Sequence, residues 1–325
     1  MAEKTGIVLE GGAMRGMFTT GVLDVLMEND ITFDGAIGVS AGATFGCNLK
    51  SKQIGRAIRY NLKYAGDKRY CSFHSLFTSG DLYNVDFCYN QIPNKLDLFD
   101  YDTYLKNPME FYVVVTDADT GITHYKKLVD CREEDTLWMR ASASMPGVSR
   151  PVEIEGKKYI DGGSTDSIPL EYFESIGFTK NVVVLTQPRD FTKQPIKFLP
   201  LMKILLRKYP TLIKALTIRH EIYNEQRRYI FSREKAGAAF IICPEKPLGI
   251  SRTEHDKGEL KRVYEEGRSV ATKRLEEIKA FLGAANNIEI TRYRDIDGGS
   301  KSGGAATQYP SQAGIPDRKS RLSGK

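Results

Sequence analysis

Ser40 is the residue of this sequence whose neighbours best suit nucleophilic chemistry. It is the middle residue of Gly38-Val39-Ser40-Ala41-Gly42, which has the pattern G-x-S-x-G. In this pattern a strand turns sharply into a helix and presents the serine at the turn, while the two glycines let strand and helix pass close together. The helix start adds free N–H groups and the positive end of its dipole. A tight turn with no catalytic role can have the same pattern. A catalytic role for Ser40 therefore also requires a base and an oxyanion site.

The glycine-rich stretch Gly11-Gly12-Ala13-Met14-Arg15-Gly16 is a candidate anion site. Successive backbone N–H groups in such a turn form a concave nest that holds an anion. The dinucleotide pattern G-x-G-x-x-G fails at Ala13, and the P-loop pattern fails at Met17. Because the serine pattern follows one strand later, the oxyanion of a tetrahedral acyl intermediate suits the stretch better than a phosphate. Glycines that merely allow close packing are the alternative.

A nucleophilic serine requires a base, and two aspartates are candidates. Asp161 ends an apolar run and precedes Gly162 and Gly163, which would let N–H groups reach its carboxylate. Asp117 ends another such run and is its rival. An ordinary Asp-Gly turn is the alternative to a catalytic role for Asp161.

Histidine is the other type of base to weigh. The chain has four, His74, His124, His220 and His255. A triad in the order Ser, Asp, His would need a late histidine, which leaves His220 or His255. Both lie in highly charged helical segments typical of a protein surface.

Alternating strands and helices are expected to position these residues. Short strands are predicted near residues 7–9, 33–40, 111–117 and 181–187, with a hairpin over 151–161 that turns at Glu155-Gly156. Helices are predicted after the glycine stretch, after Ser40, and over 131–145 before Pro146. This order predicts an α/β fold with a mainly parallel sheet covered by helices.

The second half of the chain differs in character. Residues 191–220 hold seven Lys or Arg and no acidic residue, mixed with apolar residues and three prolines. Charged helical segments follow, and the last 30 residues are rich in Gly, Ser and Pro. We therefore expect a catalytic domain over 1–190, a helical region over 191–285 packed on it, and a disordered tail over 286–325.

Composition limits the classes of function. Apolar residues make up 41% of the 325 residues, and no apolar run approaches the roughly 20 that a membrane-spanning helix needs. The five cysteines show no CxxC spacing, and the N-terminus has no apolar signal core, so free thiols in the cytoplasm are expected. A net charge of +6 permits an anionic partner, but no nucleic-acid module and no metal-ligand cluster is visible. The sequence leaves the oligomeric state open.

The order of the three motifs resembles the patatin-like phospholipase family. Its signature is a glycine-rich loop with a basic residue, then G-x-S-x-G, then D-G-[GA], seen here as GGAMRG, GVSAG and DGG. The segment from Ala141 to Gly163 also resembles the family's approach to its aspartate. The resemblance covers roughly residues 5–187.

The resemblance implies a three-layer α/β/α fold and a serine acyl-hydrolase that needs no cofactor. It makes Ser40 the nucleophile, Asp161 its base, Gly11 to Gly16 the oxyanion hole and Arg15 the basic loop residue. Ala13 departs from the family's third glycine, and a left-handed backbone there would weaken the hole. Fatty-acyl esters of phospholipids or lysophospholipids are the implied substrates.

Several questions stay open at this stage. Residues 191–220 suit a peripheral contact with an anionic membrane at its inner face, or a set of short core helices. Residues 50–110 are expected to form a lid or a pocket wall. A generic esterase or thioesterase with a His-completed triad, and a non-catalytic lipid- or nucleotide-binding protein, are the alternative functions.

Overall fold

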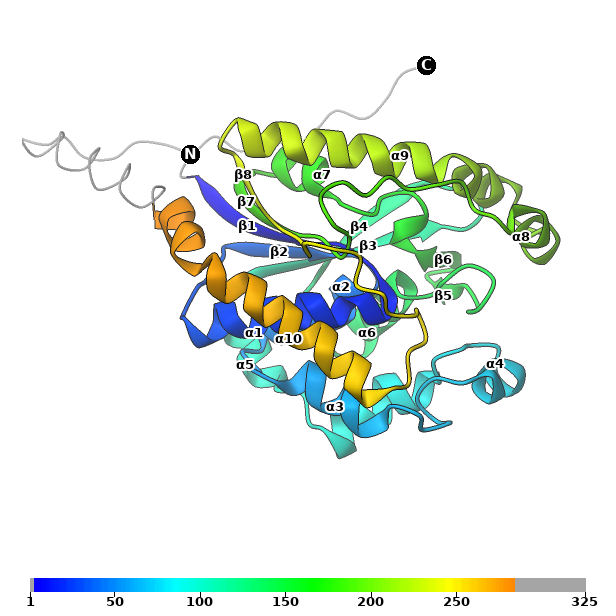
Figure 1. Cartoon of the computed structure of the whole chain (residues 1–325). Coiled ribbons are helices and arrows are strands. Elements are labelled where there is room, and N and C mark those ends of the chain that lie inside the picture. The colour runs from blue at the N-terminus through cyan, green and yellow to red at the C-terminus, as the bar shows by residue number, and fades with distance from the viewer. Residues whose placement is uncertain (1–2, 284–325) are drawn as a thin grey trace, which may run out of the picture. The chain divides into compact units, whose positions relative to one another are not determined.

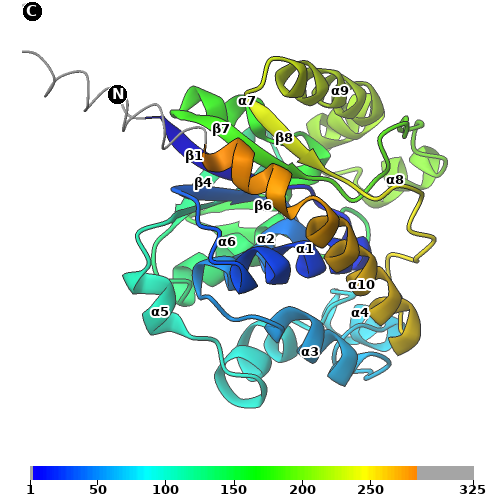
Figure 2. The same cartoon turned by 60° about the vertical axis from the view of Figure 1, so that its left-hand side comes forward.

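The computed structural model describes residues 3–283, so the tail predicted over 286–325 lies outside the described residues. One sheet of eight strands is covered by helices on both faces (Figures 1 and 2). This confirms the predicted α/β fold with three layers and a mainly parallel sheet.

The strands follow the order β5-β6-β3-β2-β1-β7-β8, with β4 paired to β3. Strands β8, β7, β1, β2 and β3 run parallel to one another, and β4, β5 and β6 make antiparallel pairs. Their bounds are β1 Lys4–Leu9, β2 Gly35–Gly38, β3 Glu110–Asp117, β4 Thr123–Leu128, β5 Val152–Ile154, β6 Lys157–Asp161, β7 Phe178–Val184 and β8 Ala239–Ile242.

The helices divide between the two faces of the sheet. Helices α1, α2, α6 and α10 lie on one face, and α7 and α9 lie on the other (Figures 1 and 2). The bounds are α1 Gly16–Glu28, α2 Ala41–Lys50, α3 Arg56–Tyr64, α4 Phe73–Ser79, α5 Tyr101–Lys106, α6 Glu133–Ser142, α7 Leu170–Ser175, α8 Leu199–Leu205, α9 Pro210–Lys235 and α10 Lys257–Lys273. Short 3-10 turns span Ala13–Arg15 (η1) and Gly162–Ser164 (η3), and a π-helix spans Phe87–Leu96 (η2).

Alternation along the central strands divides the core in two. Ile7 and Leu9 of β1 point to the core under α1, whereas Val8 points to the core under α7 and α9. Val182 and Val183 of β7 divide in the same way. Because successive side chains of a strand face opposite sides, a strand that is apolar throughout must be covered on both faces.

The predicted elements are found, and two strands are added. The hairpin turns at Glu155 and Gly156, which both have positive φ, and helix α6 ends before Pro146 as expected. Strands β4 and β8 were not predicted. Strand β4 is polar and only partly buried, and β8 is a four-residue run inside a helical region, so neither has a clear pattern in the sequence.

The region over 191–285 forms part of the same compact unit as the first half, since residues 1–285 cluster together. It contributes α8, α9 and α10 and also the edge strand β8, which pairs with β7. No helix within residues 3–283 combines the length and the apolar character that crossing a bilayer demands.

Candidate active site

Ser40 lies at the turn between β2 and α2 in a strained backbone conformation. Its φ is 54° and its ψ is −119°, a region that residues other than glycine rarely occupy. Its N–H donates to the Oγ of Ser142 over 3.1 Å. Strained residues persist only where their surroundings hold them, and they concentrate at functional sites.

The flanking glycines are required by close packing of β2, α2 and β1. A Cβ at Gly38 would lie 2.4 Å from the carbonyl oxygen of Gly42, and a Cβ at Gly42 would lie 2.3 Å from that of Leu9. Real Cβ atoms do not approach backbone oxygens so closely. This confirms the packing role that the motif predicts for Gly38 and Gly42.

The register of β3 explains why Ser40 and Asp161 meet. Strand β3 pairs with β4 along one edge, and along the other it pairs first with β2 and then with β6. Strands β2 and β6 therefore run towards each other along one edge. Gly38 opposes Val113 and Asp161 opposes Val115, two residues further on, which is about 7 Å along the strand. After β2 the chain leaves the edge of β3 at Ser40. Strand β6, which ends in Asp161, reaches the same edge of β3 from the opposite direction.

The carboxyl group of Asp161 is buried and surrounded by polar groups. Burial raises its pKa, while the Ser40 hydroxyl, the Gly163 N–H and the charges of Arg219 and Arg252 offset part of the rise. The Gly163 N–H donates to Oδ1 over 2.8 Å, as expected from the glycines that follow this aspartate. A raised pKa makes a carboxylate a stronger base, which suits proton abstraction from a hydroxyl.

One short segment at the end of α6 fixes both residues. The Oγ of Ser142 accepts from the Ser40 N–H, and the carbonyl oxygen of Ser144 accepts from the Asp161 N–H over 2.9 Å. Both serines are buried. Their contribution was missed in the sequence, where the small residues of this segment were the only signal.

The glycine loop lies directly against the serine. A Cβ at Gly11 would be 3.0 Å from the Cβ of Ser40, and Ala13 and Met14 line the same cavity as Ser40. Within residues 3–283, the N–H groups of Gly11 to Met14 donate to no backbone or side-chain acceptor. These donors are therefore unpaired within the described residues, in a loop that lies next to Ser40.

Ala13 occupies the position where the family often has a glycine, and its backbone is left-handed, with a φ of 50°. An L-residue in this region is strained by about 1 kcal/mol or more relative to glycine. The alanine keeps its N–H donor, so the strain acts on the stability of the loop.

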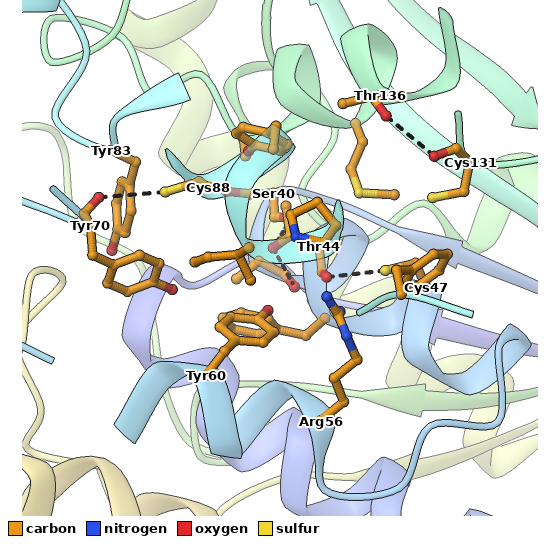
Figure 3. Close-up of a pocket in the computed structure, with 18 of the residues that line it drawn as sticks. Ser40, Thr44, Cys47, Arg56, Tyr60, Tyr70, Tyr83, Cys88, Cys131 and Thr136 are labelled. Atoms are coloured by element: carbon orange, nitrogen blue, oxygen red, sulfur yellow. Dashed lines mark hydrogen bonds between the residues drawn. The ribbon is translucent and has the colours of Figure 1, made fainter. Parts of the chain in front are cut away.

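A mainly apolar cavity of about 140 Å³ opens beside Ser40 (Figure 3). A cavity of this size takes a group such as benzene, so it fits one end of an acyl chain. Ten of its 22 lining residues come from the region 56–101, in agreement with the pocket wall predicted for residues 50–110. Lining residues from this region are Arg56, Tyr60, Tyr70, Tyr83, Cys88, Tyr89, Ile92, Pro93, Phe99 and Tyr101.

The one arginine of this wall is engaged by the protein itself. Arg56 is buried, donates to the carbonyl oxygens of Asp97 and Leu98 and to the Oδ1 of Asn48, and forms an ion pair with Asp97 at 3.4 Å. Its charge is thus compensated, and the cavity is left for an apolar ligand.

The rival bases are engaged elsewhere. The Oδ1 of Asp117 accepts from the N–H groups of Asp119 and Thr120, both at 2.9 Å, and so closes a turn. None of the four histidines, all of which lie in the described residues, lines the cavity or forms a hydrogen bond with Ser40. His124 packs against the ring of Tyr159, and His74 is exposed on α4.

Several cations near Asp161 were not predicted. Arg219 of α9 donates from Nε to the carbonyl oxygen of Gly163, and Lys193 and Arg252 approach from the segments before α8 and α10. The sequence showed a basic segment over 191–220 but not which of its residues face inward. Within residues 3–283 no three His, Cys, Asp or Glu side chains gather as a metal site would require.

Comparisons with known proteins identify the family of the chain. The model of the patatin-like phospholipases matches residues 7–174, and the chain belongs to this family. A domain of unknown function, DUF6363, matches residues 209–283.

Relatives extend over different shares of the chain. The uncharacterized protein YjjU of Escherichia coli (strain K12) is 29% identical over 265 residues, which are 75% of this chain and 70% of YjjU. Lysophospholipase NTE1 of Cryptococcus neoformans is 26% identical over 206 residues, which are 58% of this chain and 12% of NTE1. The solved structure of VipD from Legionella pneumophila has a TM-score of 0.43 and 12% identity, covering 85% of this chain and 67% of VipD. The family and the lysophospholipase relatives support lipid hydrolase activity.

Proposed function

We propose that this protein is a serine hydrolase that releases fatty acids from phospholipids or lysophospholipids through Ser40 and Asp161. The observation that carries the proposal is the end-to-end meeting of β2 and β6, which brings a strained serine to a buried carboxylate with a raised pKa. The family and the lysophospholipase NTE1 relatives support the substrate class.

The proposed reaction begins with proton transfer. Asp161 takes the proton of Ser40 while Oγ attacks the ester carbonyl carbon, and the free N–H groups of the glycine loop bind the oxyanion. Asp161 gives this proton to the oxygen of the leaving alcohol as the carbon–oxygen bond breaks, and an acyl-serine forms. Water then attacks this ester while Asp161 takes a proton from it and passes that proton to Ser40 Oγ, and the fatty acid leaves.

Labelling with a fluorophosphonate probe tests the two residues. We expect Ser40→Ala to abolish labelling and Asp161→Asn to slow it by about a hundredfold or more, because a general base contributes that much. Asp117→Asn is the matched control, since it removes an equally buried carboxylate that only closes a turn. Normal labelling of Asp161→Asn, or loss of labelling on replacement of one histidine in a folded protein, would overturn the dyad.

We further propose that the protein meets its substrate at an anionic lipid surface. On α8 and the residue before it, Phe198, Leu201 and Ile204 are 72%, 53% and 68% exposed, and Lys203 lies among them. On α4, Phe73 and Phe77 are 71% and 86% exposed. Exposed apolar groups beside basic ones bind anionic bilayers.

The two helices lie at the same end of the molecule (Figure 1), and the loop over 147–150 joins them. A Cβ at Gly147 would lie 3.1 Å from the Sδ of Met202, and one at Gly80 would lie 2.0 Å from the Nε of Arg150. We therefore propose that the exposed apolar side chains of α4 and α8 form one face for lipid contact.

Flotation with vesicles of phosphatidylglycerol and phosphatidylcholine tests this face. We expect Phe77→Ser with Phe198→Ser to lower vesicle binding by about tenfold or more, because two aromatic side chains no longer enter the bilayer. Leu105→Ser is the control, since Leu105 is 54% exposed on α5, away from this face. Equal loss in both variants, or no loss, would refute the contact.

A further inference from the structure

Four basic side chains from segments far apart in the sequence lie near one another, and two of them, Arg219 and Arg252, lie near Asp161. Arg15 follows the glycine loop, Lys193 precedes α8, Arg219 belongs to α9, and Arg252 precedes α10. Each of the first three is affected by the charge of Arg252, and Lys193 is also affected by Arg15 and Arg219. The group is therefore one cluster.

Contacts with neutral groups fix the cluster in place. The Nζ of Lys193 lies 3.7 Å from the ring centre of Tyr223, and the Lys193 backbone exchanges hydrogen bonds with the side chain of Asn224. Arg219 donates to the carbonyl oxygen of Gly163, two residues after Asp161. The cations thus reach the rim of the catalytic site from α9 and its neighbours.

The cluster has more positive than negative charge. The acidic neighbours of the cluster are Asp161 and Glu10. Both carboxylate oxygens of Glu10 already accept hydrogen bonds, from the hydroxyl of Tyr223 and from the N–H of Thr186, each at 2.6 Å. The ion pairs found within residues 3–283 include none of the four cations. The Nε of Arg15 is buried without a hydrogen-bond partner.

Burial and repulsion between the cations both act on Lys193. Burial, together with the nearby Arg219, Arg15 and Arg252, lowers its pKa to about 7, and Glu10 offsets only part of this. Burial also lowers the pKa of Arg15 and of Arg219. Arg15, Lys193 and Arg219 are partly buried, and none of them forms an ion pair within residues 3–283, so a bound anion would lower the cost of burying their charges.

The place of the cluster in the fold suits a ligand. After β1 the chain crosses to β2 through α1, and after the neighbouring β7 it crosses to β8 through α9 on the opposite face of the sheet, so the two connections diverge between β1 and β7 (Figure 1). In parallel sheets, ligands bind beyond the carboxyl ends of strands at such a point. The apolar cavity is lined by Ala41, Thr44 and Phe45 of α2 (Figure 3). Arg219 belongs to α9, and Lys193 contacts Asn224 and Tyr223 of the same helix. Helices α2 and α9 lie on opposite faces of the sheet (Figure 1).

We propose that Arg15, Lys193, Arg219 and Arg252 form an anion site for the phosphate group of the substrate. This inference rests on the proposed function. The ester would lie at Ser40, with the acyl chain in the apolar cavity and the phosphate on the opposite side. Arginine and lysine side chains are the usual partners of phosphate oxygens.

Substrate selectivity tests the site during turnover. We compare kcat/KM for lysophosphatidate and for a monoacylglycerol of the same chain, in the whole protein and in Lys193→Gln and Arg252→Gln. Both variants are expected to lower the ratio of the two values by about tenfold or more, because a hydrogen bond to a charged group is lost. Lys197→Gln, an exposed neighbour in the same segment, is the control and should keep the ratio. Arg219 is left intact because its charge lowers the pKa of Asp161.

Binding without turnover separates this proposal from the proposed function. In a Ser40→Ala background, calorimetry measures binding of glycerol 3-phosphate and of inorganic phosphate, and Lys193→Gln should weaken binding of glycerol 3-phosphate by about tenfold or more. A protein that hydrolyses no ester but shows this effect would refute the proposed function and keep the anion site. An unchanged selectivity ratio, no binding of glycerol 3-phosphate, or tighter binding of inorganic phosphate than of glycerol 3-phosphate would overturn the headgroup site.

Discussion

At the scale of single residues, the site depends on groups that are unfavourable for folding. Ser40 and Ala13 both have positive φ, and Asp161 is a carboxyl group removed from water. Each would be more stable in another conformation or protonation state, and each gains a chemical property from its position. Replacing Asp161 or Ala13 should therefore stabilise the folded protein.

The raised pKa of Asp161 predicts how the activity and the stability of the protein change with pH. If the ionised form is the base, kcat/KM for a soluble ester should fall on acidification above the ordinary aspartate pKa of about 3.9. The folded protein binds this proton more readily than the unfolded chain, so the stabilising contribution of the protonated form is lost as pH rises through the raised pKa. Asp161→Asn should therefore be more stable than the parent at pH 7.

Urea unfolding at several pH values measures this difference. The gain of Asp161→Asn should shrink as the pH falls towards 4, because the parent then carries a neutral carboxyl group as well. A variant that is less stable than the parent at pH 7 would contradict the raised pKa.

Ala13→Gly is expected to stabilise the protein. Glycine removes a left-handed strain of about 1 to 2 kcal/mol and costs about 0.5 to 1 kcal/mol in chain entropy, so a small net gain in the free energy of unfolding should appear. Ala57→Gly, in the first turn of α3, is the contrast and should cost about 1 kcal/mol. Equal losses in both variants would show that the backbone at residue 13 is not strained.

At the scale of elements, the site is made by how strands end. Strand β2 stops at Gly38, the chain turns at Ser40, and β6 continues along the vacated edge of β3. This turn requires α2 to pack directly against the ends of β1 and β2. Gly38 and Gly42 are therefore required for the close packing of the turn at Ser40.

Gly42→Ala is expected to cost about 3 kcal/mol or more and to abolish fluorophosphonate labelling. The added methyl group would lie 2.3 Å from the carbonyl oxygen of Leu9, and backbone cannot move aside as a side chain can. Gly237→Ala is the control, because its site has open space and only a left-handed backbone, which costs about 1 kcal/mol. Thermal unfolding and labelling of both variants decide, and a mild effect at Gly42 would show that α2 can shift.

At the scale of the whole molecule, the C-terminal region is part of the fold. Helix α10 packs on α1 at backbone distance, since a Cβ at Gly267 would lie 2.0 Å from the carbonyl oxygen of Phe18. Tyr264 donates to Asp24 over 2.9 Å, and Tyr223 of α9 reaches Glu10 beside the glycine loop. The regions 1–190 and 191–285, distinguished by composition, therefore share one core.

We expect one cooperative unfolding transition for both regions. The single tryptophan, Trp138 in α6, reports on the first half, and far-ultraviolet circular dichroism reports strongly on α9 and α10. Because the helices share their core with the sheet, the two signals should change together in urea. Loss of helix signal at lower urea than the Trp138 signal would show that the C-terminal region unfolds separately.

The sequence by itself determined the local parts of this site. The turn at Ser40, the glycine loop and the turn after Asp161 each depend on glycines within a few residues, and apolar runs defined the central strands. These features could be predicted because the backbone requirement and the residue that meets it are neighbours in the chain.

Only the tertiary structure decided which of these parts come together and what surrounds them. The meeting of β2 with β6 depends on the register of β3, and the cation cluster depends on contacts such as that of Glu10 with Tyr223, which are 213 residues apart. The polar strand β4 and the short strand β8 likewise exist because β3 and β7 offer them an edge. Pairing and burial over such separations are set by the packing of the whole chain, and no local pattern of residues records them.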